Sequence, residues 1–275
     1  MTTQELERTR AAWDNIAAGY DELVTPRWAL SEGALDRAGL RSGMRFLDVA
    51  CGSGALSIPA ARLGAQVLAV DLSSAMMQRL KARAHSESLS NLDGRVMDGH
   101  NLELEDDAFD VSGSQFGVML FPDLPRGLRE MARVTKPGGR VLMVVYRPPV
   151  KVEFLTFFIG AMKAVVPGFT GLPTDPPPLP FQVAEPEVLR QRMEEAGLTD
   201  VRVEAGNEQL EFRSGKHMWD WVTNSNPIGA MMVADLTEEQ KIEVQQVLDG
   251  MLRERSGGQP TAILNNEVNI GVGTK

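Results

Sequence analysis

The sequence predicts an α/β fold built on a doubly wound, mostly parallel sheet. Short apolar runs at 45–50, 66–71 and 141–145 have the near-continuous hydrophobic character of strands that are buried on both faces. Such runs alternate with helical stretches, and this alternation is typical of parallel sheets with right-handed crossovers. At 275 residues, of which 43% are hydrophobic, the chain is long enough for a single domain over 1–275.

Helices and strands alternate through the first half of the chain. The expected helices cover 4–24, which is amphipathic, 27–39, 55–63, a segment capped by Ser73 or Ser74, and 123–134. The expected strands cover 45–50, 66–71, 93–98, 109–115 and 141–145. Residues 136–139 read as a turn, because proline and glycine interrupt both kinds of element.

The second half of the chain is less regular. A helical segment and the proline-rich stretch 173–180, expected to be a loop, lie within 148–184. The further expected elements are a helix over 185–196, strands at 200–205 and 208–213, mostly helix over 216–255, and a last strand over 261–274. We therefore expect N-terminal helices over 1–40, a core over 41–147, and insertions at 148–184 and 215–260 that form a lid over the sheet edge.

Composition and charge exclude several classes of function. A formal net charge of −9 argues against a nucleic-acid partner, because phosphate backbones are held mainly by clustered Lys and Arg. Cys51 is the only cysteine, so neither an intrachain disulfide nor a cysteine zinc cluster can form, and we expect no metal site. The sequence shows neither a signal peptide nor an apolar run that could cross a bilayer, so we expect a cytoplasmic protein without stable membrane insertion.

The most informative segment is the turn after the first apolar strand, where Asp48 precedes Gly52 and Gly54. Glycines let the backbone approach a ligand, but a dinucleotide-binding loop needs a third glycine where Ser57 stands, and the Gly-Lys-Ser/Thr of a P-loop is absent. The carboxylate of Asp48 suits a ligand with a positively charged amino group, such as S-adenosylmethionine, and would repel a pyrophosphate. A turn or cap role for Asp48 stays open.

Acids also end the next two strands of the predicted sheet. Asp71 can accept hydrogen bonds from ribose hydroxyls, and Asp98, with Gly99 beside it, from an adenine amino group. His100 fits the adenine pocket or a satisfied surface histidine better than a catalytic base. Because the carboxyl ends of parallel strands meet at one edge, these residues and the glycine loop are expected to form one crevice. Capping roles for the two acids remain the alternative.

Taken together, these motifs resemble the class I S-adenosylmethionine-dependent methyltransferases, and within them the branch of the ubiquinone/menaquinone C-methyltransferases (methyltransferase type 11). The resemblance covers residues 9–146, including the helix at 13–21, and one departure is Ala50 in place of the first loop glycine. It implies a Rossmann-like sheet of seven mostly parallel strands with an antiparallel last strand and helical lid insertions. It also implies S-adenosylmethionine as cofactor, bound by Tyr20, Asp48, Ala50, Cys51, Gly52, Gly54, Asp71, Leu72, Met76, Asp98, Gly99, His100 and Gln115.

The acceptor is less well indicated than the cofactor. Because a sulfonium is a good leaving group, holding donor and acceptor in line and excluding water can supply much of the catalysis. If a base is needed, His217 and His100 are the candidates. The apolar residues of the insertions would suit an aromatic or lipophilic small molecule, although they fit equally well as the core of the inserted helices. The residues we expect to contact the acceptor are Arg147, Phe158, Trp219 and Asn224.

Two other functions stay open at this point. One is an NAD-dependent oxidoreductase on a related fold, against which Asp48 and Ser57 count. The other is a non-catalytic protein that binds S-adenosylmethionine, against which the retained glycines and strand-end acids count. The oligomeric state is not indicated by the sequence.

Overall fold

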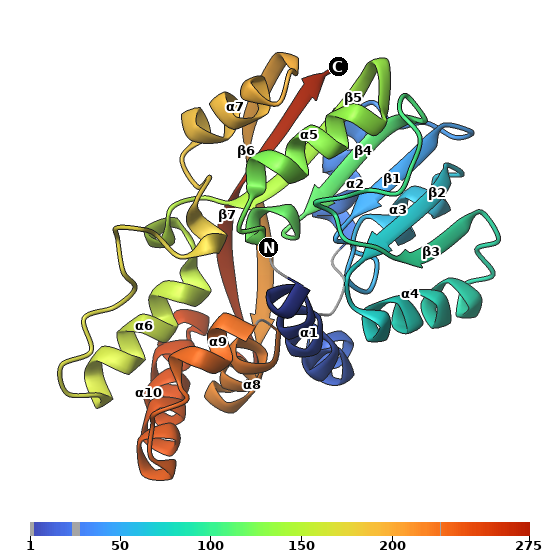
Figure 1. The fold of residues 1–275 in the computed structure, drawn as a ribbon. Helices are drawn as coiled ribbons and strands as arrows, with labels where there is room; N and C mark the ends of the chain where they lie inside the picture. The colour runs from blue at the N-terminus through green and yellow to red at the C-terminus, as the bar shows by residue number, and fades with distance from the viewer. Residues whose placement is uncertain (1–2, 24–27, 226) are drawn as a thin grey trace.

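A computed structural model describes residues 3–23, 28–225 and 227–275. Within these residues, seven strands form one sheet in the order β3-β2-β1-β4-β5-β7-β6 (Figure 1). The last strand, β7, is antiparallel to β5 and β6, and the remaining pairs are parallel. This arrangement confirms the predicted doubly wound, Rossmann-like sheet with an antiparallel last strand.

The observed elements follow the predicted order. The strands are β1 (Arg45–Val49), β2 (Gln66–Asp71), β3 (Leu92–Val96), β4 (Phe109–Gln115), β5 (Thr135–Tyr146), β6 (Thr199–Phe212) and β7 (Ala262–Thr274). The helices are α1 (Thr3–Leu23), α2 (Trp28–Arg37), α3 (Ser57–Arg62), α4 (Ser74–Ser86), α5 (Leu124–Val134), α6 (Glu153–Val165), α7 (Pro186–Glu195), α8 (Gly215–Ser225), α9 (Pro227–Met232) and α10 (Glu238–Ser256). The expected helix limits at 24 and 27 lie outside the described residues.

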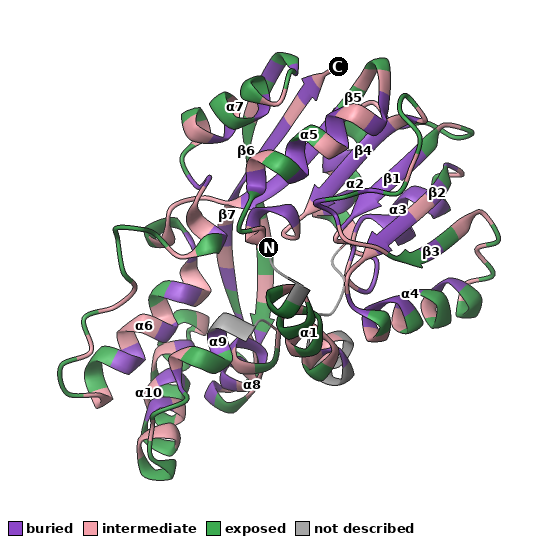
Figure 2. Ribbon diagram, in the orientation of Figure 1, coloured by how far each residue is buried: buried purple, intermediate pink, exposed green. Residues whose placement is uncertain are grey.

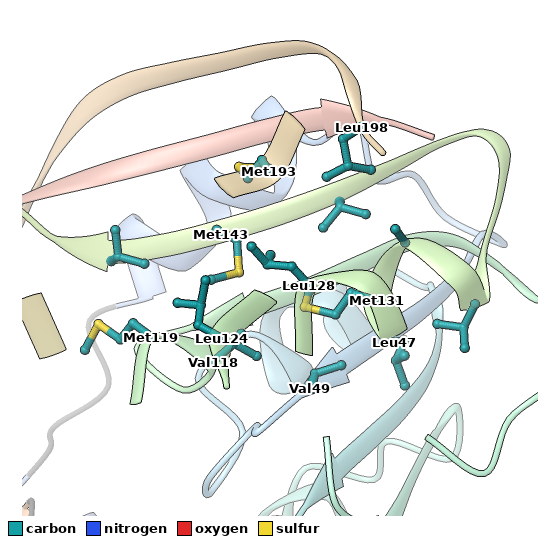
Figure 3. Close-up of a cluster of buried hydrophobic side chains, with 14 of the residues drawn as sticks. Leu47, Val49, Val118, Met119, Leu124, Leu128, Met131, Met143, Met193 and Leu198 are labelled. Carbon is teal, nitrogen blue, oxygen red and sulfur yellow. The ribbon is translucent and has the colours of Figure 1, made fainter. Parts of the chain in front are cut away.

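Helices cover both faces of the sheet, which explains the near-continuous apolar strands (Figures 1 and 2). On one face, α5 and α7 contribute Leu128, Met131 and Met193 to a buried cluster that also contains Leu47 of β1 and Met143 of β5 (Figure 3). On the other face, α2 and α3 pack against β1, β2, β4 and β5, and α4 packs beside them on β2. The carboxyl edge of the sheet, where the parallel strands end, therefore lies between two layers of helices.

The expected turn at 136–139 is wrong, because these residues lie within β5. Gly138 has a φ of 77°, and its N–H donates to the carbonyl oxygen of Lys275 at 2.9 Å. The register between β4 and β5 shifts at this point. The glycines therefore absorb an irregularity inside a strand, as in a β-bulge, and do not end it.

The expectation of two strands at 200–205 and 208–213 is also wrong, because both belong to the single strand β6. Gly206 and Asn207 read as a turn in the sequence, yet they pair with Val268 and Glu267 of β7. The pairing with a long partner strand thus overrides the local turn signal. As a result, β6 and β7 run together beyond the point where β5 ends at Tyr146.

The inserted helices gather around the far part of this β6–β7 ribbon. Phe212 and Leu264 of the ribbon share a buried cluster with Phe158 of α6, Met218 of α8 and Leu248 of α10. In Figure 1 these helices lie beside the carboxyl edge of the sheet, with α1 between them and α4. The division of the chain into N-terminal helices, core and lid stays a prediction. Among the described helices, none combines the length and apolarity needed to cross a bilayer.

Candidate active site

A cavity of about 670 Å³ lies at the carboxyl edge of the sheet. Its wall includes the loops after β1 and β3, the ends of β2, β4 and β5, the middle of β6, and parts of helices α1, α2, α4, α6 and α8. Most of the residues expected to bind the cofactor line it: Tyr20, Ala50, Cys51, Gly52, Asp71, Leu72, Met76, Asp98, Gly99, His100 and Gln115. The crevice predicted from the strand ends is therefore present as one cavity.

The loop after β1 has the backbone shape that a close ligand requires. Gly52 has a φ of 53°, and a Cβ added there would meet nothing within 4 Å, so the space above the loop is open. Gly54 has a φ of 104° and serves a different purpose, because an added Cβ would clash with Leu80 of α4. Gly52 is therefore positioned to face a ligand, whereas Gly54 allows the loop to pack on the helix behind it.

Ala50 has a φ of 53°, in the left-handed region that costs a residue with a Cβ about 1–2 kcal/mol. Ala50→Gly is expected to raise the free energy of unfolding by up to about 1 kcal/mol, because the relief of strain exceeds the added entropy of glycine in the unfolded chain. Urea denaturation measures this change. The control is Ala82→Gly on the exposed side of α4, which should lose about 1 kcal/mol; an equal loss in both variants would contradict the strain.

Asp48 lies beneath the loop and does not line the cavity. Its side chain is buried, and the Ser57 hydroxyl donates to its Oδ2 at 2.5 Å. Burial raises the pKa of Asp48 to about 7, against the lowering effect of the hydrogen bonds from Ser57. Asp48 and Gly54 are thus the two expected cofactor residues outside the cavity wall. The expected role of Asp48 in holding an amino group stays a prediction.

Asp71 joins the loop to the next helix at the end of β2. Its Oδ2 accepts from the backbone N–H of Gly52 at 2.9 Å, and its Oδ1 accepts from that of Ser73 at 2.8 Å. Burial raises the pKa of Asp71, and these backbone donors counteract the rise. Because a carboxylate has about four acceptor positions, each oxygen can also accept from a ribose hydroxyl.

Asp98 and His100 form a hydrogen-bonded pair at the end of β3. Oδ1 of Asp98 accepts from the backbone N–H of His100 at 2.9 Å and lies 2.8 Å from its Nδ1, and the side-chain bond lowers the pKa of Asp98. The imidazole stacks on Phe121 with 4.2 Å between ring centroids. Its Nε2 is buried without a hydrogen-bond partner within the described residues. A ligand edge with hydrogen-bonding groups would complete this pocket.

The residues expected to contact the acceptor lie outside the cavity wall. Arg147 forms an ion pair with Glu267 at 2.8 Å, and the exposed Asn224 donates to the carbonyl oxygen of Asp220. His217, the other candidate base, accepts from the backbone N–H of Arg213 at 3.3 Å. The two remaining expected residues are buried in the cluster of inserted helices: Phe158 and Trp219.

The wall contains other residues in place of those expected to contact the acceptor. Tyr146 ends β5, Glu208 lies on β6, and Trp221 lies on α8. Tyr146 could have been found from its position at a strand end, as Asp71 and Asp98 were. Glu208 and Trp221 carry no comparable local signal. The further aromatic residues of the wall are Trp13, Trp28, Phe116, Phe121, Phe154 and Phe181.

Comparison with known proteins agrees with this geometry. The sequence model of a family described as "Methyltransferase domain" matches residues 47–143. A 2-phytyl-1,4-naphtoquinone methyltransferase of Trichormus variabilis is 32% identical over 169 residues, which cover 57% of this chain and 72% of that protein. An uncharacterised protein of Mycobacterium tuberculosis is 34% identical over 180 residues, covering 59% of this chain, and the match spans 64% of the length of that relative.

The fold has counterparts among solved structures. Phosphoethanolamine N-methyltransferase 2 of Haemonchus contortus, in complex with phosphomonomethylethanolamine and S-adenosylhomocysteine, superposes with a TM-score of 0.59. The identity is 19%, and the match covers 98% of this chain and 59% of that chain, so it shows the fold alone. The naphthoquinone methyltransferase, of which nearly three quarters is matched, carries the assignment. The chain therefore belongs to the class I S-adenosylmethionine-dependent methyltransferases.

Proposed function

We propose that this protein transfers the methyl group of S-adenosylmethionine to a small-molecule acceptor of aromatic or lipophilic character. The observation that carries the proposal is a single cavity with two kinds of wall. One wall is the glycine loop with Asp71 at the end of β2 and Asp98 after β3, and the other is aromatic and comes from the ends of β4 and β5 and from α1, α6 and α8. A donor and an acceptor bound to these two walls would share one enclosed space.

Three features of the wall with the glycine loop suit S-adenosylmethionine. Asp71 would bind the ribose hydroxyls, and Asp98 with His100 would bind the adenine, for which the unpartnered Nε2 of His100 is available. The open space above Gly52 would take the methionine part. When bound, this cofactor supplies an electrophilic methyl carbon on a sulfonium.

The acceptor wall is a chain of aromatic contacts. Phe116 stacks on Tyr146 with 4.4 Å between centroids, Tyr146 meets Phe154 edge-on at 5.7 Å, and Phe154 meets Trp221 edge-on at 4.7 Å. Rings in this arrangement favour a flat apolar ligand. The name of the Trichormus variabilis relative, a naphthoquinone methyltransferase, supports an acceptor of the same character.

Helix α1 contributes to the exclusion of water from this space. Trp13 and Tyr20 of α1 line the cavity. The same helix is tied to the start of α4, because Oδ1 of Asp14 accepts from the hydroxyl of Ser73 at 2.6 Å and from the backbone N–H of Ala75 at 3.1 Å. A covering helix that is fixed to the cofactor side would favour direct transfer over loss to water.

Calorimetric titration with S-adenosylhomocysteine, with NADH as a parallel ligand, tests the proposal. We expect micromolar binding of S-adenosylhomocysteine and no binding of NADH, because Ser57 replaces the third glycine and its hydroxyl is bound to Asp48. Binding of NADH alone would favour the oxidoreductase alternative. Binding of S-adenosylhomocysteine without turnover of any phenol, quinol or amine in the presence of S-adenosylmethionine would favour the non-catalytic alternative.

A further inference from the structure

Two ionisable side chains meet inside the aromatic part of the cavity. The hydroxyl of Tyr146, at the end of β5, donates to Oε2 of Glu208 on β6 at 3.0 Å. Both side chains line the cavity. β7 lies between the two strands, with Val268 opposite Tyr146 and Asn266 opposite Glu208, so the pair spans an ordered sheet.

The position of Glu208 is fixed from its backbone as well. Asn266 is fully buried, and its Nδ2 donates to the carbonyl oxygen of Glu208 at 3.2 Å. Oδ1 of Asn266 accepts from the backbone N–H of Phe154 at 3.0 Å. One buried amide thus links the backbone of Glu208 to that of Phe154, whose ring contacts Tyr146. Such fixed placement is what a proton-transferring group requires.

Among the residues that the structure describes, no cation stabilises the ionised form of the Glu208 carboxyl group. Glu208 is half-buried and lines the cavity. Burial raises its pKa to about 7, against the lowering effect of the Tyr146 hydroxyl, and no cation of the described residues contributes. A carboxylate that gains a proton near neutral pH suits general-base chemistry.

A hydrogen-bond donor without a partner lies nearby. The indole Nε1 of Trp221 is buried and has no hydrogen-bond partner within the described residues. Trp221 lines the cavity and is 7% exposed. Its ring meets Phe154, which also meets Tyr146, so the indole N–H and the Tyr146–Glu208 pair flank the same ring. The wall of the cavity therefore contains both a carboxyl group that can accept a proton and a residue with an unused N–H donor, and Phe154 contacts the aromatic ring on each side.

We propose that Glu208 is the general base of the reaction and takes the proton from an aromatic hydroxyl on the acceptor, while the N–H of Trp221 donates to an oxygen of the same molecule. The proposal rests on the methyl transfer proposed above. The O–H bond of the acceptor breaks and its proton passes to the Glu208 carboxylate. The oxygen's electron pair forms the bond to the methyl carbon, and the carbon–sulfur bond breaks with its pair left on sulfur. Tyr146 is a positioning residue, because it holds the carboxylate through its own hydroxyl.

The rival acceptor is a cationic amine, which an anionic carboxylate among aromatic rings could also bind. The unpartnered N–H of Trp221 favours the hydroxyl, because an ammonium group offers no lone pair to an N–H donor, whereas a hydroxyl both donates and accepts. The apolar surroundings favour it further, since a neutral ligand does not have to lose the hydration of a charge.

The test compares three probes for binding to the complex of the whole protein with S-adenosylhomocysteine. The probes are 1-naphthol, 1-methoxynaphthalene and the cation of 1-naphthylmethylamine, measured at pH 8, above the pKa of Glu208. We expect 1-naphthol to bind at least about tenfold more tightly than the methoxy compound, because only the naphthol donates to the carboxylate. Equal binding of the two, or tighter binding of the amine, would overturn the proposal.

Two variants test whether the preference for 1-naphthol depends on the side chain of Glu208. Glu208→Gln keeps the shape and removes the charge, so it should reduce the preference for 1-naphthol by about tenfold. Glu204→Gln is the matched control, because Glu204 lies on the same strand but pairs with Arg37 outside the cavity wall. A preference that survives in Glu208→Gln would overturn the role of Glu208. Failure to bind S-adenosylhomocysteine in the first step would instead overturn the methyltransferase function, so the two failures are distinguishable.

Discussion

Replacing Asp71 by alanine is expected to weaken the binding of S-adenosylhomocysteine by more than about tenfold. Two hydrogen bonds from ribose to a charged acceptor would be lost, and each such bond contributes about 1.5–3 kcal/mol. The same carboxylate accepts from the N–H groups of Gly52 and Ser73, so its loss also releases the glycine loop from the start of α4. Both effects act in the same direction on affinity.

Calorimetry on control variants places the loss on Asp71. Ser73→Ala removes the hydroxyl that accepts from the N–H of Met76 and donates to Asp14, but it keeps the backbone N–H that bonds to Asp71, so it should cost less affinity than Asp71→Ala. Asp93→Ala removes an exposed acid of β3 that pairs with Arg95 outside the cavity wall, and should leave affinity unchanged. Affinity equal to that of the unmodified protein in Asp71→Ala would remove this residue from the cofactor site.

The cofactor side of the cavity could be predicted from the sequence because its signals are local. Asp71 ends β2 and Asp98 follows β3, and parallel strands bring their carboxyl ends to one edge whatever the rest of the chain does. The glycine loop needs a positive φ at Gly52, which restricts the residue type at that position. Each of these features is encoded within a few residues.

The acceptor side could not be predicted because it depends on which face of a distant helix turns inward. Trp219 and Trp221 are two residues apart on α8, so they point about 200° apart around the helix. Both belong to the buried cluster of the inserted helices, where Trp219 packs near Phe158, but of the two only Trp221 also lines the cavity. Both tryptophans are among the apolar residues of the insertions, and the sequence does not show which of them faces the cavity.

The place of Glu208 in the cavity wall cannot be predicted from the sequence for a related reason. It reaches the cavity because β6 continues as one strand past Gly206 and Asn207, where the sequence reads as a turn. The continuation depends on pairing with β7, whose opposite residue lies 58 positions away in the chain. Short-range patterns do not contain that information. The same holds for Asn266, whose side-chain amide donates to the carbonyl oxygen of Glu208.

Replacing Asp48 by asparagine is expected to stabilise the folded protein increasingly as the pH rises from 4 to 8. The pKa of Asp48 is about 7 in the folded protein and 3.8 as its ordinary value. Below 3.8 the carboxyl is protonated in both states. Between 3.8 and 7 the unfolded chain gives up this proton while the folded protein keeps it, so stability is lost as the pH rises, by about 1.4 kcal/mol per unit. Asparagine cannot ionise and avoids this loss.

Urea denaturation of both proteins at several pH values measures the difference. The gain of Asp48→Asn should grow across this window to about 4 kcal/mol at most. Taking the difference isolates Asp48, because the other shifted groups, such as Glu208 and Asp98, are common to both proteins. In Asp36→Asn, a change at an exposed acid, the difference should stay flat within a few tenths of a kcal/mol. If the difference in free energy of unfolding for Asp48→Asn is also independent of pH, the buried carboxyl has its ordinary pKa in the folded protein.

The same variant decides what the buried acid contributes to the site. Asp48 lies under the loop that would hold the methionine part of the cofactor, and its hydrogen bond to Ser57 links the start of α3 to β1. If Asp48→Asn is more stable at pH 8 but binds S-adenosylhomocysteine more weakly, the negative charge serves the ligand's amino group through the loop at a cost in stability. If it is more stable and binds equally well, Asp48 serves the loop through shape and hydrogen bonding, and the ammonium group is held by other residues of the wall.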